Sequence, residues 1–440
     1  MRTKRMSNGG PTLRGRAKLS GGLGVSGEVR DPGLLSHYVA YMKAALALIR
    51  KHEIERRERP NALWLVIRLF EPLKELPELQ GLHTHVVSSY LGESVLARAA
   101  DGQVDAAKAD PHWFMNFYMM PVLTAYIGPD LLLGFDERRA RLVYADLESS
   151  LGATQEVYSI MAPLQHFEGP DEEIRLDAKM VLRKLTQDDM QYLRCPDEFG
   201  GMVERRDALS MRFCLAASLV TEKGAVTKLS EVRGPVMRVV TALRLLKSGQ
   251  VGVPVVIQRL REPAFGLAGG TFSVSGAPAA LGPSYTLLLE ESKQLIVTCR
   301  ALAKAASAKH LRVPLRRFNQ AYERDRAEDR LIDYWVALEA LFSPPGSGEL
   351  TYRIALRAAY FIASLPEERE QIFTALRDHY GTRSDVVHGR KPKRDVKIAA
   401  GAVEDYLRRA LKKIVSDPGS FRPDELDLVV ARGQFQQGAG

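Results

Sequence analysis

The feature that most restricts the fold is the helical repeat that fills the last third of the chain. From Leu287 onward, apolar residues recur every three to four positions, which is the spacing of one face of an α-helix. Pro and Gly interrupt this repeat at 343–348, where the sequence reads Ser-Pro-Pro-Gly-Ser-Gly. We therefore predict an all-α bundle over residues 285–416, with helices over 287–308, 315–342, 350–364, 366–389 and 395–415.

A mixed α/β domain is predicted to precede the bundle, over residues 151–262. Short apolar and β-branched runs there alternate with an amphipathic helix that ends near Gly249. Residues 263–284 are rich in Gly, Pro, Ala and Ser, a composition typical of a linker. The elements expected before this linker are a strand pair over 173–184, a strand over 209–219, a helix over 236–246 and a strand over 253–258. The chain as a whole is expected to belong to the α+β class.

The beginning of the chain is harder to interpret. Residues 1–32 are rich in Gly, Ser, Arg and Lys, and we expect a flexible basic lead-in. Residues 33–150 are expected to form a mixed α/β region of unknown role. Its predicted elements are a helix over 34–58, a buried strand over 62–70 and a hairpin over 131–144. At the other end, residues 417–440 are expected to form a C-terminal tail.

The composition indicates a soluble, mildly basic protein. Lys and Arg outnumber Asp and Glu by 62 to 53, and the resulting charge of +9 is compatible with a nucleic-acid partner. Many proteins without such a partner are also mildly basic. Cys195, Cys214 and Cys299 are widely spaced and odd in number, which favours the cytoplasm over a disulfide scaffold. Polar residues and Pro interrupt the apolar stretch 113–135, so no membrane span is expected.

No cofactor or metal site is expected. The sequence has no GxxxxGK[ST] phosphate loop and no CxxC pair. His83 and His85 have a spacing that would suit a metal site on a strand, but no cluster of Cys, Asp or Glu accompanies them. A structural role is therefore the favoured interpretation of these two histidines.

The fourth predicted helix of the bundle carries an arginine on its apolar stripe. The stripe runs from Ile372 to Tyr380, and the same spacing continues to Arg383 and Val387. Burying a guanidinium group without a partner is unfavourable. Glu339, at the edge of the apolar face of the second predicted helix, is the carboxylate that we expect to pair with Arg383.

His388 lies at the end of the same helix, directly before Gly389. Ser384 and Asp385 precede it by about one turn and share its side of the helix. A histidine can move the proton of a 2′-hydroxyl or a leaving group, and an arginine can stabilise negative charge on phosphoryl oxygens. The next cations are expected to hold neighbouring phosphates of RNA, and they are Arg390, Lys391, Lys393 and Arg394. Taken alone, such an Arg–His pair is more often structural, and such a basic run more often lies in a solvated loop.

Arg383 and His388 match the R-x(4–6)-H signature of HEPN domains. Two more stretches strengthen the match, namely Asp333–Phe342 (Asp-Tyr-Trp-Val-Ala-Leu-Glu-Ala-Leu-Phe) and Tyr352–Arg357 (Tyr-Arg-Ile-Ala-Leu-Arg). In this order and spacing, and with Arg383–Gly389, they resemble the Apea-like HEPN subgroup. The resemblance covers roughly residues 285–415 and extends more loosely to about residue 155.

The resemblance implies an up-and-down helical bundle that commonly dimerises, so that two R-x4-H motifs face each other across a composite cleft. Active members are metal-independent endoribonucleases that leave 2′,3′-cyclic phosphate ends, and many act in anti-phage defence or as toxins. By position, Arg383 and His388 would be the catalytic pair, and Glu339 would support them.

The sequence leaves two functions open. The first is an RNA-cleaving effector of the defence or toxin type, with an unidentified trigger or antitoxin as partner. The second is a non-catalytic HEPN module for dimerisation or nucleic-acid binding. The second stays open because Ser384 follows the arginine, where active members often carry Asn, Asp or His.

Overall fold

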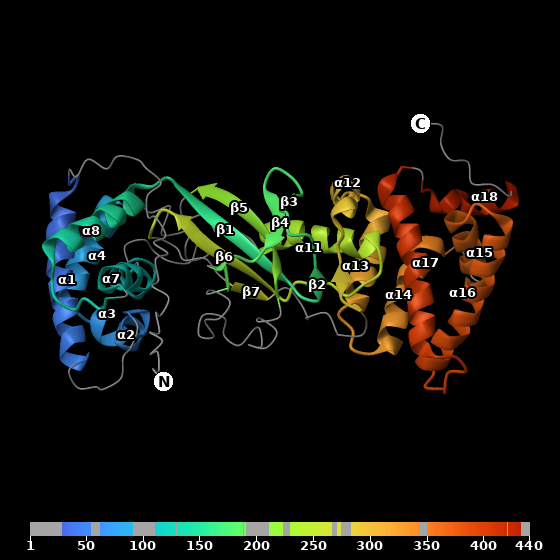
Figure 1. Ribbon diagram of the computed structural model, residues 1–440, viewed down its shortest axis with the longest axis horizontal. Helices are drawn as coiled ribbons and strands as arrows, with labels where there is room; N and C mark the ends of the chain where they lie inside the picture. The colour runs from blue at the N-terminus through green and yellow to red at the C-terminus, as the bar shows by residue number, and fades with distance from the viewer. Residues whose placement is uncertain are drawn as a thin grey trace, which may run out of the picture. The chain divides into compact units, whose positions relative to one another are not determined.

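The computed structural model divides the chain into two compact units, with a boundary after Gly152 (Figure 1). No helix among the described residues is both long and apolar enough to cross a bilayer. The described residues are 29–53, 62–90, 111–128, 130–187, 189–190, 211–222, 229–265, 271–273, 283–343, 350–419 and 421–432.

The first unit is helical wherever the structure describes it. Its longest helix, α1 (Pro32–Glu53), packs against α4 (Pro77–Ser89) and α8 (Glu137–Gly152). A second contact joins α2 (Ala62–Arg68) to α7 (Met120–Ile127). The remaining elements are short, namely α3 (Phe70–Lys74), α6 (Pro111–Phe114) and the π-helical turn η2 (Met115–Met119).

The prediction of a mixed α/β region over residues 33–150 is therefore wrong for the described part of this unit. The predicted strand over 62–70 forms α2 and the start of α3. Of the predicted hairpin over 131–144, the part from Glu137 onward forms the first half of α8. A short apolar run fits a buried helix as well as a buried strand, because periodicity does not separate the two. In α8 the buried side chains recur at helical spacing, at Ala140, Val143, Tyr144, Leu147 and Leu151.

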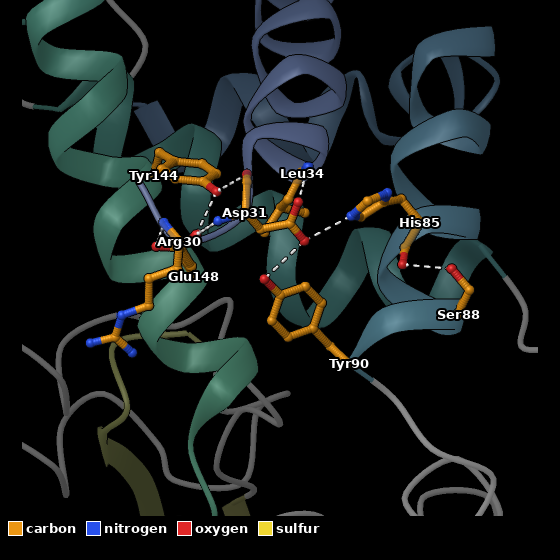
Figure 2. Close-up of polar contacts among 8 residues, drawn as sticks. All are labelled: Arg30, Asp31, Leu34, His85, Ser88, Tyr90, Tyr144 and Glu148. Carbon is orange, nitrogen blue, oxygen red and sulfur yellow. Dashed lines mark hydrogen bonds and ion pairs between the residues drawn. The ribbon is translucent and has the colours of Figure 1, made fainter. Parts of the chain in front are cut away.

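Asp31 joins three helices of the first unit through polar contacts (Figure 2). Its carboxylate caps α1 by accepting the Leu34 N–H at 2.8 Å, and it also accepts the Tyr90 hydroxyl at 3.1 Å. His85 Nε2 on α4 lies 2.9 Å from the same carboxylate. Glu148 on α8 accepts the backbone N–H of Asp31 at 2.7 Å. The start of α1 is thereby fixed to both of its neighbours.

The second unit begins with an antiparallel sheet of strand order β3-β4-β5-β1-β6-β7. The central strand β1 (Gln155–Leu164) pairs with β5 (Phe213–Glu222) on one side and with β6 (Val255–Glu262) on the other. The outer strands are β3 (Ile174–Arg175), β4 (Met180–Lys184) and β7 (Thr271–Ser273). A separate parallel pair joins β2 (Phe167–Glu168) to β8 (Tyr285–Thr286).

This topology confirms most of the strands predicted between residues 151 and 262. The predicted strand pair over 173–184 corresponds to β3 and β4, and the strands predicted over 209–219 and 253–258 correspond to β5 and β6. The predicted linker over 263–284 differs from the structure, because β7 lies inside it and pairs with β6. A segment that extends the sheet does more than connect two domains.

The helices of the second unit follow the predicted order. They are α11 (Leu229–Leu246), α12 (Ser292–Ala305), α13 (Arg312–Ala321), α14 (Ala327–Phe342), α15 (Leu350–Ile362), α16 (Pro366–Val387), α17 (Val396–Ser416) and α18 (Leu426–Arg432). The predicted helix over 315–342 is two helices. The first, α13, ends at Ala321, and the chain then turns so that α14 packs against α13. Asp333 on α14 holds this turn by accepting hydrogen bonds from Arg317 and Arg324, both at 2.8 Å. The α+β class is confirmed.

The sheet and the bundle share one hydrophobic core, in which α11 covers one face of the sheet. Buried Arg244 on α11 crosses the junction. It donates to the backbone carbonyl of Val251 at 2.8 Å and to the Asn319 side chain on α13 at 2.9 Å. Arg408 on α17 donates to the Arg244 carbonyl at 2.9 Å. These contacts satisfy polar groups that would otherwise destabilise the core.

The C-terminal segment, predicted as a tail, contributes a helix that packs on α15. Asp427 of α18 accepts hydrogen bonds from Arg357 at 2.7 Å and from Arg353 at 2.9 Å. Arg357 is only 2% exposed. The hydrogen bond from Arg357 lowers the pKa of Asp427 by more than burial raises it, so this pKa lies below the ordinary value of 3.8. The docking of α18 therefore supplies the counter-charge of a buried arginine.

We expect Asp427→Ala to lower the free energy of unfolding by about 1–3 kcal/mol, because it removes the partner of a buried guanidinium group. Asp424→Ala is the matched control, since it removes the same charge from an exposed position in the turn before α18. Its effect should stay within about 0.5 kcal/mol. Urea unfolding followed by circular dichroism measures both variants. Equal stability of the two would contradict the anchoring role of Asp427.

Candidate functional site

Helix α16 carries the predicted catalytic residues near its C-terminal end. Leu365 precedes the helix in an extended conformation and Pro366 opens it, with Glu367 and Glu368 in the first turn. The buried side chains of α16 are Ile372, Leu376, His379 and Thr382. Arg383 was predicted on the inward stripe, and it lies instead at the edge of this buried face, with its side chain 22% exposed. Val387 does not continue it, because its side chain is 47% exposed.

The predicted contact between Arg383 and Glu339 is present. The guanidinium nitrogen Nη2 lies 3.6 Å from the Glu339 carboxylate on α14, and both side chains are about a quarter exposed, at 22% and 25%. The Arg383 guanidinium also lies 5.5 Å from the centre of the Tyr380 ring. Tyr380 in turn packs edge-to-face on buried Trp335, at 5.2 Å between ring centres. Two helices therefore hold the arginine at the surface of the bundle.

Burial and charge oppose each other at Glu339. Burial raises the pKa of this carboxyl above its ordinary value of 4.5, and the positive charge of Arg383 limits the rise. A carboxyl whose pKa is raised by folding stabilises the fold on the acid side, and this contribution is lost as the pH rises through the raised pKa. Arg383 therefore matters most at neutral pH, where Glu339 is ionised.

His388 lies outside the bundle interior, at the C-terminus of α16. Its backbone N–H donates to the Ser384 carbonyl at 3.0 Å, and its side chain is exposed. The next two residues close the helix, because Gly389 donates to Val386 at 3.1 Å and Arg390 donates to Asp385 at 2.8 Å. Gly389 has a φ of +66°, a conformation that favours glycine. Ser384 and Asp385 thus supply backbone acceptors that fix the position of His388.

The basic run forms the loop between α16 and α17. Arg390, Lys391 and Lys393 are exposed. Arg394 is held by an ion pair with Asp378 on α16, at 2.7 Å. The next residue, Asp395, caps α17 by accepting the Lys397 N–H at 2.7 Å. The loop is therefore anchored at its end, and the structure brings its cations to the same end of α16 as His388.

The same helix also carries an aromatic and cationic cluster that the sequence analysis did not predict. Arg377 lies 5.4 Å from the Phe373 ring and 5.9 Å from the ring of Tyr352 on α15. Tyr352 is 44% exposed. The spacing of Phe373, Arg377 and Tyr380 at four and three residues could have revealed this face before the structure. Exposed aromatic and guanidinium planes next to the motif are suited to contact nucleobases.

The histidine pair with metal-like spacing does not form a metal site. His83 and His85 lie on helix α4, where residues two apart point in different directions. His83 is buried and lies 5.5 Å from the Phe114 ring, whereas His85 reaches Asp31. Among the residues that the structure describes, no group of three or more His, Cys, Asp or Glu side chains could hold a metal ion.

The cysteines that the structure describes are unsuited to nucleophilic chemistry. Cys214 on β5 and Cys299 on α12 are free and buried. Burial raises the pKa of each thiol to about 12, so both are protonated at neutral pH. Cys195 lies outside the described residues.

Comparison with known proteins gives no relative from which a function could be carried over. No family model matches the chain, and no curated protein or solved structure matches it. The function therefore has to be inferred from the residues and their geometry.

We expect Arg383→Ala to lower the free energy of unfolding at pH 7 by about 1 kcal/mol, the upper end for a partly exposed ion pair. The loss should shrink near pH 4, where Glu339 becomes protonated, and in a Glu339→Gln background, where no negative charge needs a partner. Denaturant titrations of the four proteins of this double-mutant cycle measure the coupling. An equal effect of Arg383→Ala in both backgrounds and at both pH values would contradict the pairing.

Proposed function

We propose that the chain is a metal-independent endoribonuclease whose catalytic residues are Arg383 and His388. One observation carries the proposal: an arginine held by Glu339 at the bundle surface lies on the same helix as an exposed histidine, beside an exposed cationic loop. Five residues of helix correspond to an axial rise of about 7.5 Å and a rotation of about 140°, so the two side chains lie near the same end of α16 but leave it in different directions. The resemblance to Apea-like HEPN domains supports the same residues.

The proposed reaction is attack of a ribose 2′-oxygen on the adjacent phosphorus. The 2′-hydroxyl loses its proton to a base, the new O2′–P bond forms, and the P–O5′ bond breaks as the 5′-oxygen gains a proton. The products are a 2′,3′-cyclic phosphate and a 5′-hydroxyl. His388 would either accept the proton of the 2′-hydroxyl or donate the proton to the 5′-oxygen. Arg383 would stabilise the negative charge on the phosphoryl oxygens.

A single imidazole cannot supply both proton transfers in one step. A second copy of the chain would provide the other histidine if two α16 ends faced each other. Exposed Val387, directly before His388, and exposed Tyr352 on α15 would bury apolar surface in such a contact. We therefore include a homodimer with a composite cleft in the proposal.

The biological setting of the proposal follows from the resemblance. A role as a defence or toxin effector in the cytoplasm, restrained by a trigger or antitoxin, is the role of many similar domains. The two free, buried cysteines are compatible with a reducing compartment.

We expect the purified protein to cleave mixed RNA in the presence of EDTA. Arg383→Ala and His388→Ala should each reduce cleavage by about 10²-fold or more, because each removes a group that acts on the transition state. Denaturing gels and detection of the 2′,3′-cyclic phosphate ends provide the measurement.

The matched controls are Arg50→Ala and His52→Ala, which change an exposed arginine and an exposed histidine in the last turn of α1. Both should retain full cleavage. RNA binding without cleavage, unaffected by His388→Ala, would refute the ribonuclease. That result would instead favour a non-catalytic HEPN module, the role that Ser384 leaves open.

The active species should have the mass of two chains by light scattering after size-exclusion chromatography. Two inactive variants, Arg383→Ala and His388→Ala, should also elute as dimers, because neither side chain is expected to dominate the interface. A strictly monomeric protein that still cleaves RNA would contradict the composite cleft.

A further inference from the structure

The segment from Ser292 to Tyr322 contains no aspartate or glutamate. It forms α12, the turn η4 (Lys309–Leu311) and α13, at the junction between the sheet and the rest of the bundle (Figure 1). Seven of the 62 lysines and arginines lie in it, so this segment accounts for most of the net charge of +9. None of these cations belongs to the proposed catalytic site.

Three of the seven cations form a row along the exposed side of α12. Lys293, Arg300 and Lys304 are spaced by seven and four residues, which places them on one side of the helix. All three are exposed. The row is about 16 Å long, because each helical residue rises by about 1.5 Å. The buried side chains of α12 lie on the opposite side, at Leu295, Thr298, Cys299, Leu302 and Ala305.

Three further exposed cations follow this row. Lys309 lies in η4, and Arg312 and Arg316 lie one turn apart on α13. The seventh cation, Arg317, is bound to Asp333 at 2.8 Å and is not counted. None of the six exposed cations forms an ion pair with another residue that the structure describes. We call these six residues, Lys293, Arg300, Lys304, Lys309, Arg312 and Arg316, the α12–α13 basic surface.

Neighbouring carboxylates leave this surface positively charged. Glu291, in the turn before α12, is bound to Lys247 at 2.5 Å. Burial is the main cause of the raised pKa of Cys299 on α12, and the charges of Asp177 and Arg238 affect this pKa in opposite directions. Glu290 and Asp177 are exposed, and counting both against the six cations still leaves four positive charges in excess. Such an excess of one sign favours a polyanionic ligand.

The phosphate chain of a nucleic acid fits this surface better than a lipid bilayer does. A helix that lies on a membrane inserts a wide apolar face, whereas the apolar face of α12 is buried in the core. Within the row itself, Val297 is the one apolar side chain, at 63% exposed. A linear row of cations instead matches a linear polyanion.

The contacts that this surface offers are to the backbone of a nucleic acid and not to its bases. Phe318 is the one Phe, Tyr or Trp residue between Ser292 and Ala321, and it is buried. Bases therefore find no aromatic ring to stack on here. Lysine and arginine contacts to phosphates position a strand and carry no sequence information.

We propose that the α12–α13 basic surface binds the phosphate backbone of RNA without sequence preference and holds a part of the substrate that is not cut. The choice of RNA rests on the proposed ribonuclease function, whereas the phosphate chain follows from the charge and its linear arrangement.

The surface and the catalytic helix belong to one compact unit. Helices α12 and α16 both pack against α17, and the axes of packed helices are about 8–10 Å apart. The two sites are therefore separated by a distance on the order of 20 Å. At about 3.4 Å per nucleotide, about six nucleotides span this distance.

The experiment measures RNA binding separately from cleavage. A fluorescently labelled single-stranded RNA, long enough to span both sites, is titrated with the full chain carrying His388→Ala, and anisotropy is recorded at several salt concentrations. Adding Lys293→Ala, Arg300→Ala and Lys304→Ala should weaken binding about tenfold or more at moderate salt. The slope of log K against log salt should fall by about 2, because each lost phosphate contact contributes about 0.7. RNAs of different base sequence should show the same loss.

Two control variants test whether position and charge cause the loss. Arg50→Ala, Lys51→Ala and Arg138→Ala together remove three exposed cations from the first unit and should change neither the affinity nor the slope. The row variant with Lys293→Arg, Arg300→Lys and Lys304→Arg keeps the charge and should keep most of the affinity.

Equal losses in the row variant and the first-unit variant would overturn the proposal. A loss confined to one base sequence would also overturn it, because it would indicate recognition of bases. Vesicles of phosphatidylserine and phosphatidylcholine provide the third arm. Vesicle binding that requires the three row cations, with RNA affinity unchanged by their removal, would replace RNA by a membrane as the partner.

The failure of this inference and that of the ribonuclease proposal are distinguishable. If the wild-type chain cleaves RNA while the row variant binds RNA normally, only this inference fails. If the row variant loses binding while the wild-type chain never cleaves, only the ribonuclease proposal fails. If the wild-type chain cleaves, removing the row should raise KM for the long RNA and leave kcat unchanged. A dinucleotide substrate, too short to reach the row, should keep its KM.

Discussion

Arg244 lies at the point where the sheet, α11 and the bundle meet, and the second unit depends on how its charge is accommodated. The side chain is 2% exposed, and its guanidinium lies 4.3 Å from the Tyr322 ring. The Arg244 guanidinium donates hydrogen bonds to Val251 and Asn319, and Arg408 donates a hydrogen bond to the backbone carbonyl of Arg244. A buried guanidinium with these partners restricts how α11, α13 and α17 can pack, because shifting any one of them would leave a buried polar group unsatisfied. The hydrophobic core supplies most of the stabilisation, and this network selects one arrangement.

That arrangement gives the unit two surfaces of different chemistry. At the end of α16, Arg383 is held by Glu339 and Tyr380 while His388 is exposed, which separates a positioned charge from an accessible proton carrier. On the sheet, the face that α11 leaves uncovered carries basic side chains and Asp189 around apolar and hydroxyl side chains. A ribonuclease needs both a reacting centre and a means to hold the strand. The proposed function assigns the reacting centre to the first surface, where the exposed cations of the neighbouring loop are placed to hold the strand.

The bundle was the most predictable part of the chain, because residues close together in the sequence determine where its helices begin and end. The two ends of helix α16 could be predicted from Pro366, Glu367 and Glu368 at its start and from Gly389 after its end. Each of these residues satisfies a requirement of a helix terminus. The pairing of Arg383 with Glu339 could also be anticipated, since a charge on an apolar stripe requires a partner on a neighbouring helix. Val387 shows the limit of this reasoning, because the exposed end of a helix need not continue its buried face.

The sequence by itself determined the α+β class, the order of the bundle helices and the candidate motif, because these depend on residues close together in the chain. Only the tertiary structure decided that residues 62–70 form a helix, that Thr271–Ser273 joins the sheet and that Asp427 docks on Arg357. It also gathered Lys179, Arg183, Arg259 and Arg261 around one recess. Such contacts join residues that are far apart in sequence, and the free energy that selects them comes from packing and charge pairing rather than from local conformational preference.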